Sequence, residues 1–272
     1  MGNHVQLEFA AATDTGRVRS HNEDSTILSP NFGLAILADG MGGYNAGEVA
    51  SRIATTVVQQ SIETHLQAPE SDWQVNRPKH VPQILSEAVD CANAAILDAA
   101  LKEPQFTGMG TTLVLALFYH DKVALAHVGD SRAYRFRGGE LEQITRDHSL
   151  LQEQIDAGLI SAEWAQFSQN KNLITRAVGV DNMLQAEVHE HQIEPGDIYL
   201  LCSDGLSDML TSRQIAEALA TLGTNLTMAA EALVERANEH GGRDNISVIL
   251  IRVQTVSAEK EGLFGRILNW MK

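Results

Sequence analysis

The segment FGLAILAD, from Phe32 to Asp39, is a short apolar run that ends in a carboxylate. Two other runs have the same form, VALAHVGD ending at Asp130 and DIYLLCSD ending at Asp204, and the run NISVILIRV directly follows Asp244. Runs this short and this apolar predict buried β-strands. The sequence therefore predicts acidic side chains at the ends of several buried strands, where the chain leaves the core.

These strand-end carboxylates predict a cation site. Clustered carboxylates repel one another unless protonation or a bound cation neutralises them. Oxygen ligands without a matching set of Cys or His residues suit hard cations such as Mg²⁺ or Mn²⁺. A site of this kind indicates function more strongly than any other feature of the chain.

The order of the remaining apolar patterns indicates the fold class. Strands are expected near residues 5–12, 27–28, 32–38, 111–119, 122–127, 133–137, 141–144, 186–192, 198–202 and 246–253. Helical periodicity covers residues 46–66, 82–101, 149–157, 212–221 and 227–240, and residues 67–82 are expected to form a surface loop. Strands and helices that come in groups rather than in alternation are typical of an α+β protein with antiparallel sheets.

The composition excludes several classes of protein. The 272-residue chain has a net charge of −15, which argues against nucleic acid as a partner because phosphate backbones are bound by basic surfaces. No run approaches the roughly 18–20 apolar residues of a membrane span, and the N-terminus lacks the basic and apolar regions of a signal peptide. Cys91 and Cys202 have no metal-site or redox spacing and are expected to be reduced core residues, which fits a cytoplasmic setting.

Six short motifs surround the acidic residues. They are TDTGRVRSHNEDS (residues 13–25), ADGMGG (38–43), GTT (110–112), VGDSRAY (128–134), SDGLSD (203–208) and GGRDNISV (241–248). Asp-Gly alone is a common turn, but the six motifs in this order resemble the metal-dependent Ser/Thr phosphatases of the PP2C (PPM) family, in their compact bacterial form. The resemblance runs from Leu7 to Val253. It implies a four-layer α-β-β-α sandwich in which two antiparallel sheets are flanked by helix pairs. The phosphatase domain would span residues 1–254, with a flap at about 147–176.

The resemblance also implies a metal centre with two core ions, Mn²⁺ or Mg²⁺. In this family pattern Asp39 bridges the two ions and the Gly40 carbonyl is a ligand of one of them. Asp204 and Asp244 would bind the other ion. A two-metal site of this kind clamps the phosphoryl oxygens and supplies a nucleophile near neutral pH.

Other residues match supporting roles in the family. Glu23 matches an acid that holds a metal through a bound water, and the neighbouring Asp24 is a weaker candidate for an outer role. Asp130 matches the aspartate that helps to hold a third, looser ion. The alternative for each aspartate is an ordinary turn or cap residue.

Arg19 matches the family arginine that grips the substrate phosphate, a role that suits the bidentate guanidinium group. Arg17 is a nearby competitor for this role. Asn245 is expected either to orient the shell around Asp244 through its amide or to act only as a turn residue.

Two departures from the family pattern stand out. Met41 stands where many eukaryotic members have a histidine that is proposed as the general acid, which leaves that role unassigned; His21 and His148 are candidates only by their proximity to motifs. Ser168-Gln169 stands where bacterial members often have His-Pro, so the specificity of the flap cannot be carried over.

The C-terminal segment, residues 255–272, allows two interpretations. On a helix, its apolar residues Leu263, Phe264, Ile267, Leu268 and Met271 would share one face. This segment is expected either to dock onto a membrane surface or a partner, or to pack on its own domain.

The sequence thus predicts a protein phosphatase that hydrolyses phosphoserine and phosphothreonine with metal-activated water and opposes a bacterial Ser/Thr kinase. It would be a cytoplasmic monomer, peripheral to the membrane only through its tail. One alternative is a stress-regulator phosphatase with a single protein substrate. Another is a pseudo-phosphatase that only binds phosphoproteins, but such a protein should have lost a metal carboxylate, and none is lost here.

Overall fold

The computed structural model describes residues 5–43, 46–67, 77–161 and 173–256. Its strands form two sheets in which every pairing is antiparallel. The five-stranded sheet has the order β1 (Val5–Asp14), β11 (Ile246–Val256), β10 (Ile198–Cys202), β7 (Arg132–Arg137), β8 (Glu140–Gln143). The six-stranded sheet has the order β2 (Asp24–Ser29), β3 (Leu34–Met41), β5 (Leu113–Tyr119), β6 (Lys122–Val128), β9 (Glu187–Gln192), with β4 (Gly110–Thr111) paired to β3.

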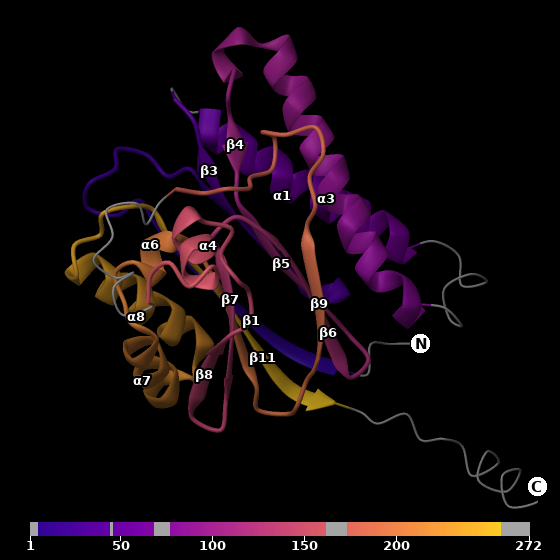
Figure 1. Cartoon of the computed structure of the whole chain (residues 1–272). Helices are drawn as coiled ribbons and strands as arrows, with labels where there is room; N and C mark the ends of the chain where they lie inside the picture. Colours follow the sequence, from indigo (N-terminus) through magenta and orange to yellow (C-terminus); the bar gives the residue numbers. More distant parts are fainter. Residues whose placement is uncertain (1–4, 44–45, 68–76, 162–172, 257–272) are drawn as a thin grey trace, which may run out of the picture.

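Two pairs of helices cover the outer faces of these sheets (Figure 1). Helices α1 (Ala46–Gln67) and α3 (Arg77–Lys102) share one core with the six-stranded sheet. Helices α7 (Ser212–Leu222) and α8 (Leu226–Glu239) share a second core with the five-stranded sheet, and a third core lies between the sheets. The α+β class and the four-layer α-β-β-α sandwich predicted from the sequence are therefore confirmed.

The short apolar runs arise because each central strand is covered on both faces. In β3, Leu34 and Ile36 point to the helix side whereas Ala35 and Leu37 point between the sheets. Strand β10 divides in the same way, with Leu200 on the helix side. Full burial of a Leu or Ile side chain is worth roughly 1.5–3 kcal/mol. These strands therefore anchor the residues that follow them.

The smaller elements complete the chain. They are the 3₁₀ turns η1 (Pro30–Phe32) and η2 (Pro104–Phe106) and the helices α4 (Leu150–Asp156) and α6 (Asp204–Ser207). Helix α4 begins at the cap Ser149, whose side chain accepts from the Gln152 amide, and ends before Gly158, which has a φ of +68°. The sequence predicts α4 correctly but misses α6, because four residues are too few to show helical periodicity.

Two sequence predictions are wrong in the structure. Helix α3 begins at Arg77 and contains Pro82, so residues 77–82 of the surface loop predicted at 67–82 are helical instead. Pro82 stands inside this 26-residue helix, beyond its first turn, where it cannot donate to the carbonyl four residues before it. Cys91, predicted to be a core residue, is exposed on α3, whereas Cys202 is buried in β10 as expected; both thiols are free.

Within the described residues, no helix combines the length and the apolarity needed to cross a membrane. The predictions for Ser168-Gln169 and for the apolar face of the C-terminal tail lie outside the described residues.

Candidate metal centre and active site

Asp39 lies near the end of β3, where its backbone is held by the GTT motif. Its carbonyl oxygen accepts from the Thr112 amide at 2.8 Å and from the Thr111 hydroxyl at 2.8 Å. Its own N–H donates to Thr112 Oγ1 at 3.0 Å. The GTT motif therefore fixes the backbone that presents the Asp39 carboxylate.

Gly40 and Glu23 pack tightly against the start of α1. The Gly40 amide donates to the Glu23 carbonyl at 3.1 Å, and the same carbonyl accepts from the Ser51 hydroxyl at 2.6 Å. A Cβ atom on Gly40 would lie 2.1 Å from the Gly47 carbonyl oxygen. No side chain fits there, and this close approach places Glu23, Gly40 and α1 together.

Asp24 connects the two sheets at this edge. It is the cross-strand partner of Asp39 in the β2–β3 pair. Its Oδ2 accepts from the hydroxyl of Ser203 at 2.9 Å, and Ser203 directly precedes Asp204 at the end of β10. The acidic ends of β3 and β10, which belong to different sheets, therefore meet at Asp24.

Asp244 and Asn245 organise the loop that carries the first motif. The Asn245 side-chain oxygen accepts from the Glu23 amide at 2.8 Å, and its side-chain nitrogen donates to the carbonyls of Thr15 and His21 at 2.9 and 3.0 Å. The Asn245 amide also donates to Asp244 Oδ1 at 2.9 Å. Of the two roles open to Asn245 in the sequence, the orienting role agrees with these contacts.

Arg19 lies at the exposed rim of the acidic group. Its Nη2 donates to Asp244 Oδ2 at 2.6 Å, and its side chain is half exposed. Its electrostatic neighbours also include Glu23 and Asp204. The backbone amide of Arg17, the competing arginine, donates to the Gly242 carbonyl at 2.7 Å. Arg19 is therefore the arginine that faces the carboxylates.

Asp130 follows β6 and is buried, with 7% of its surface exposed. The neighbouring Ser131 hydroxyl lies 2.7 Å from Thr112 Oγ1, which links this turn to the Asp39 backbone. Asp130 is thus linked to Asp39 through Thr112 of the GTT motif, and its charge acts on the Asp39 carboxylate.

The carboxylates influence one another strongly. Burial raises the pKa of Asp39 well above its ordinary value, and the charges of Asp24, Asp204, Asp130 and Asp244 raise it further. Burial raises the pKa of Asp204 well above its ordinary value in the same way, followed by the charges of Asp130 and Asp244. Loss of surrounding water also raises the pKa of Asp24 to about 6 and that of Asp130 to about 6. The acidic residues predicted from separate parts of the sequence therefore form one electrostatic cluster.

This cluster fits the binding of hard divalent cations. Oδ1 of Asp24 and Oδ1 of Asp204 are buried and find no hydrogen-bond partner among the residues that the structure describes. Orphaned, buried carboxylate oxygens are costly unless a cation or a proton satisfies them. Oxygen donors gathered from several loops match the ligand preference of Mg²⁺ and Mn²⁺.

The two histidines considered as general acids differ in position. His21 is half exposed, and its Nε2 lies 3.2 Å from Glu23 Oε1. His148 is buried, and its ring contacts Gly129 and Glu187 rather than the carboxylate cluster. Of the two histidines, His21 is therefore the one whose ring contacts a candidate metal-binding residue.

Sequence reasoning undervalued two acidic residues. Asp24 was expected to have an outer role but stands between Asp39 and Asp204. Asp208, not singled out in the sequence, contributes to the raised pKa of both Asp130 and Asp204. Its position four residues after Asp204, at the end of α6, is the signal that could have identified it.

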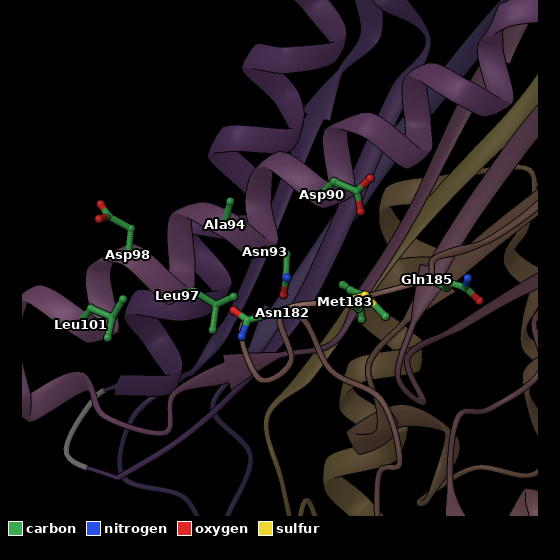
Figure 2. Close-up of a pocket in the computed structure, with 10 residues that line it drawn as sticks. Asp90, Asn93, Ala94, Leu97, Asp98, Leu101, Asn182, Met183 and Gln185 are labelled. Carbon is green, nitrogen blue, oxygen red and sulfur yellow. The ribbon is translucent and has the colours of Figure 1, made fainter.

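A separate surface pocket of about 640 Å³ lies between α3 and residues 182–185 (Figure 2). Asn93 joins the two sides, accepting from the Gly179 amide at 2.7 Å and donating to the Asp181 carbonyl at 2.8 Å. None of the cluster carboxylates lines this pocket. The pocket is therefore distinct from the acidic edge.

Comparison with known proteins gives one consistent result. The family model of protein phosphatase 2C matches residues 16–240. The serine/threonine phosphatase stp of Listeria monocytogenes is 36% identical over 242 residues, which cover 88% of this chain and 93% of that protein.

Solved structures agree in fold. The crystal structure of the serine/threonine phosphatase PstP/Ppp of Mycobacterium tuberculosis matches with a TM-score of 0.82 and 38% identity, covering 92% of this chain and 100% of that one. The catalytic domain of PstP in complex with two manganese ions matches with a TM-score of 0.80 and 38% identity, covering 92% and 99%.

Proposed function

This chain belongs to the protein phosphatase 2C family, and we propose that its carboxylate cluster is the active site of a metal-dependent protein serine/threonine phosphatase. The observation that carries the proposal is the convergence of Asp39, Asp204 and Asp244 at one edge of the sandwich, where burial and then the charges of its acidic neighbours raise the pKa of Asp39. A cluster built only to stabilise the fold would not gather like charges.

Two divalent cations, Mn²⁺ or Mg²⁺, are assigned to this cluster. Asp39 would lie between them, with the Gly40 carbonyl on one ion, Asp204 and Asp244 on the other, and Glu23 completing the shell. Asp130 would hold a third, looser ion. The two manganese ions reported for PstP and the orphaned oxygen atoms of Asp24 and Asp204 support this assignment. Bound cations of this kind polarise phosphoryl oxygens and supply a nucleophile near neutral pH.

The chain's own residues bind and orient the substrate around these ions. The Arg19 guanidinium, half exposed at the rim, can turn from Asp244 to a phosphoryl group and pair with two of its oxygens. Asn245 and the GTT motif hold the carboxylate-bearing loops in place. His21, hydrogen-bonded to Glu23, is the histidine within reach of a leaving group.

The proposal extends to the substrates, the oligomeric state and the cellular location of the enzyme. Phosphorylated proteins are the substrates, as the names of the bacterial relatives indicate. We propose that the enzyme is a cytoplasmic monomer that opposes a Ser/Thr kinase, in a phosphatase domain of residues 1–254 with a flap at about 147–176. Two free thiols agree with a reducing compartment. The C-terminal segment, residues 255–272, would provide peripheral attachment to a membrane or a partner.

Hydrolysis of p-nitrophenyl phosphate with Mn²⁺, with and without EDTA, tests the chemistry. A panel of phosphoserine, phosphothreonine and phosphotyrosine peptides then tests the substrate class. We expect metal-dependent release of phosphate from the first two peptides. Activity that survives EDTA, or phosphopeptide binding without turnover, would reject the proposal.

A further inference from the structure

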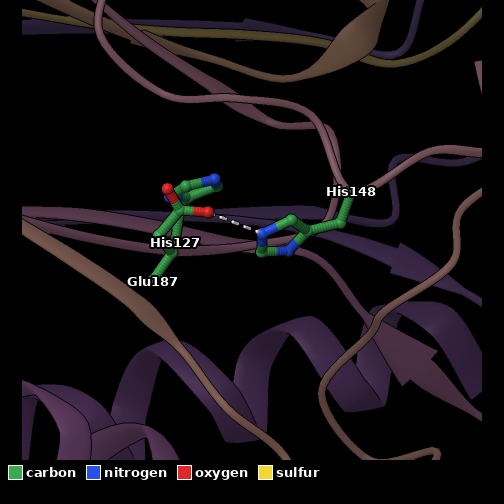
Figure 3. A group of neighbouring side chains, drawn as sticks. All are labelled: His127, His148 and Glu187. Carbon is green, nitrogen blue, oxygen red and sulfur yellow. Dashed lines mark hydrogen bonds and ion pairs between the residues drawn. The ribbon is translucent and has the colours of Figure 1, made fainter. Parts of the chain in front are cut away.

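A largely buried group of polar side chains lies between β6, β9 and the segment before α4 (Figure 3). It consists of His127, His148 and Glu187, whose potential ligand atoms lie within 4.8 Å of one another. His127 and His148 are 1% and 5% exposed. None of these residues takes part in the proposed chemistry, so the group requires its own explanation.

A metal ion is not the explanation that the geometry favours. The two imidazole rings are stacked, with centroids 4.7 Å apart and an angle of 21° between their planes. An imidazole binds a metal in its own plane, and two nearly parallel stacked planes offer no shared point close to both rings. Arg176 Nη1 also lies 3.3 Å from His148 Nε2, and its positive charge would oppose a cation there.

The hydrogen bonds of His148 define a single neutral tautomer. The Gly129 amide donates to His148 Nδ1 at 3.2 Å, so Nδ1 must be the acceptor and the proton is assigned to Nε2. Nε2 then donates to Glu187 Oε2, also at 3.2 Å, as the dashed line in Figure 3 marks. The nearby Arg176 group is a close approach rather than a donor, because a neutral ring cannot accept at both nitrogens.

Backbone and side chain of His148 grip the same glycine. The His148 amide donates to the Gly129 carbonyl at 2.9 Å, while the Gly129 amide donates to the ring. Gly129 has a φ of +99°, and a Cβ atom there would lie 2.8 Å from Thr112. Asp130 is the next residue. The backbone on the N-terminal side of Asp130 is therefore fixed by the two bonds from His148 to Gly129. Thr112 of the GTT motif packs against the same glycine and contacts the Ser131 hydroxyl that follows Asp130.

His148 also joins this turn to both ends of the proposed flap. Its carbonyl accepts from the Thr175 amide at 2.8 Å. The next residue, Ser149, forms a bridge with Ile174, and the Leu150 amide donates to the Leu173 carbonyl at 2.9 Å. One residue thus connects the Asp130 turn, the ends of the flap and strand β9.

We propose that His148 is a positioning residue that fixes Asp130 through Gly129 and couples this carboxylate to the ends of the flap. The inference rests on the proposed function, because the catalytic importance of Asp130 is itself part of that proposal. The Nδ1 acceptor sets the turn, and the bond from Nε2 to Glu187 holds the ring in the orientation that presents Nδ1.

Two substitutions separate the roles of the two ring nitrogens. His148→Asn places an oxygen close to the position of Nδ1 and can still accept from Gly129, but it cannot reach Glu187. His148→Gln places its amide close to Nε2 and can still reach Glu187, but it offers Gly129 no acceptor. His189→Gln is the matched control, because His189 bonds the other oxygen of Glu187, at 2.7 Å, without touching Gly129.

The expected results follow from these geometries. His148→Gln should lower kcat on a phosphopeptide by about 10-fold, in the range of residues that orient metal ligands. His148→Asn should recover most of this loss, and His189→Gln should match wild type. Adding His148→Gln to Asp130→Ala should cost little more than Asp130→Ala alone, because both changes disturb one unit.

Amide hydrogen exchange at Gly129, followed by NMR, provides a readout independent of catalysis. Gly129 should be protected in wild type and His148→Asn and should exchange faster in His148→Gln. The proposal would be overturned if the losses of activity in the double variant were fully additive. It would also be overturned if His148→Asn and His148→Gln lost activity and Gly129 protection equally. If the wild-type protein is inactive but its Gly129 amide is protected, the proposed function is rejected while the hold of His148 on Gly129 is established.

Discussion

Arg19 donates from Nη2 to Asp244 Oδ2 at 2.6 Å, across 225 residues of sequence. This bond joins the proposed phosphate-binding group to a proposed metal ligand. One guanidinium cannot satisfy Asp244 fully and bind a phosphoryl group in bidentate fashion at the same time. Cations on Asp244 would take over its charge and leave Arg19 available to the substrate.

Arg19→Ala should therefore raise KM much more than it lowers kcat. Loss of a charge-assisted pair costs about 1.5–3 kcal/mol, which corresponds to roughly a 10- to 100-fold loss in kcat/KM. Mn²⁺ affinity by calorimetry should stay nearly unchanged, because Asp244 itself remains. Arg17→Ala is the control and should behave as wild type. Wild-type kinetics in Arg19→Ala would transfer the role to Arg17 or to the cations alone.

Asp39→Asn should almost abolish activity while the fold is retained. The substitution removes one negative charge from the centre of the cluster, and the backbone contacts to Thr111 and Thr112 do not involve the carboxylate. Changes to residues that merely orient metal ligands cost 10- to 100-fold, so loss of a direct ligand should exceed about 100-fold in kcat/KM. Calorimetry should show much weaker Mn²⁺ binding, and circular dichroism should be unchanged. Unaltered Mn²⁺ affinity in the folded variant would refute the bridging role.

The strand-end aspartates and the sandwich could be predicted from the sequence because both depend on local patterns. A strand covered on both faces must be continuously apolar, as β3 and β10 are, and a carboxylate after such a strand must lie at the edge of the core. The central place of Asp24 could not be predicted in this way. It depends on the β2–β3 register that sets Asp24 opposite Asp39, and on Ser203, which is 179 residues distant.

The remaining differences have the same physical origin. The hydrogen bond from the Glu23 amide to the Asn245 side chain joins residues 222 positions apart, so no local sequence pattern predicts it. Cys91 shares helical spacing with buried neighbours, yet the face of α3 that packs is narrower than the sequence pattern suggests. Local periodicity indicates which side of an element is apolar, but the packing partner decides how much of that side is covered.

Asp130→Ala should slow turnover without emptying the two-ion core. The Asp130 carboxylate is assigned to the looser ion and not to the two-ion core. We expect about a 10-fold lower kcat, most visible on phosphopeptides, in the range found when groups around a metal site are changed. Calorimetry should still detect the two tighter ions. If the variant binds no Mn²⁺ or fails to fold, Asp130 belongs to the core shell or to the structure.

Deletion of residues 262–272 should leave hydrolysis of p-nitrophenyl phosphate intact, because every proposed site residue precedes Val253. The basic residues Lys260, Arg266 and Lys272 would favour anionic lipid, but the charge of −15 on the whole chain would be repelled by it. Membrane association should therefore be weak and sensitive to salt. Co-sedimentation with anionic liposomes compares the two forms. Equal sedimentation would reject attachment through the tail, and a large loss of thermal stability would show that the tail packs on its own domain.

The metal-free protein should lose stability as the pH rises through the range in which its carboxylates ionise. Folding raises the pKa of Asp24 and Asp130 from 3.8 to about 6 and that of Asp39 well above 3.8. The folded state therefore retains protons that the unfolded state releases. The contribution of Asp24 and Asp130 to stability is complete below the unfolded pKa and is lost as the pH rises through about 6.

Asp39→Asn gives this prediction a matched comparison. Because the variant has one repelling charge fewer, it should melt at a higher temperature than wild type in EDTA at about pH 8, and the difference should shrink towards about pH 5. Saturating Mn²⁺ should reverse the order at about pH 8, because a ligand at 100 times its Kd stabilises the folded state by about 2.7 kcal/mol and wild type binds it better. Thermal melts at several pH values, with EDTA or Mn²⁺, measure both effects. If wild type is more stable than Asp39→Asn in EDTA at every pH, the carboxylates do not repel one another. The electrostatic argument for a cation site at this edge would then fail.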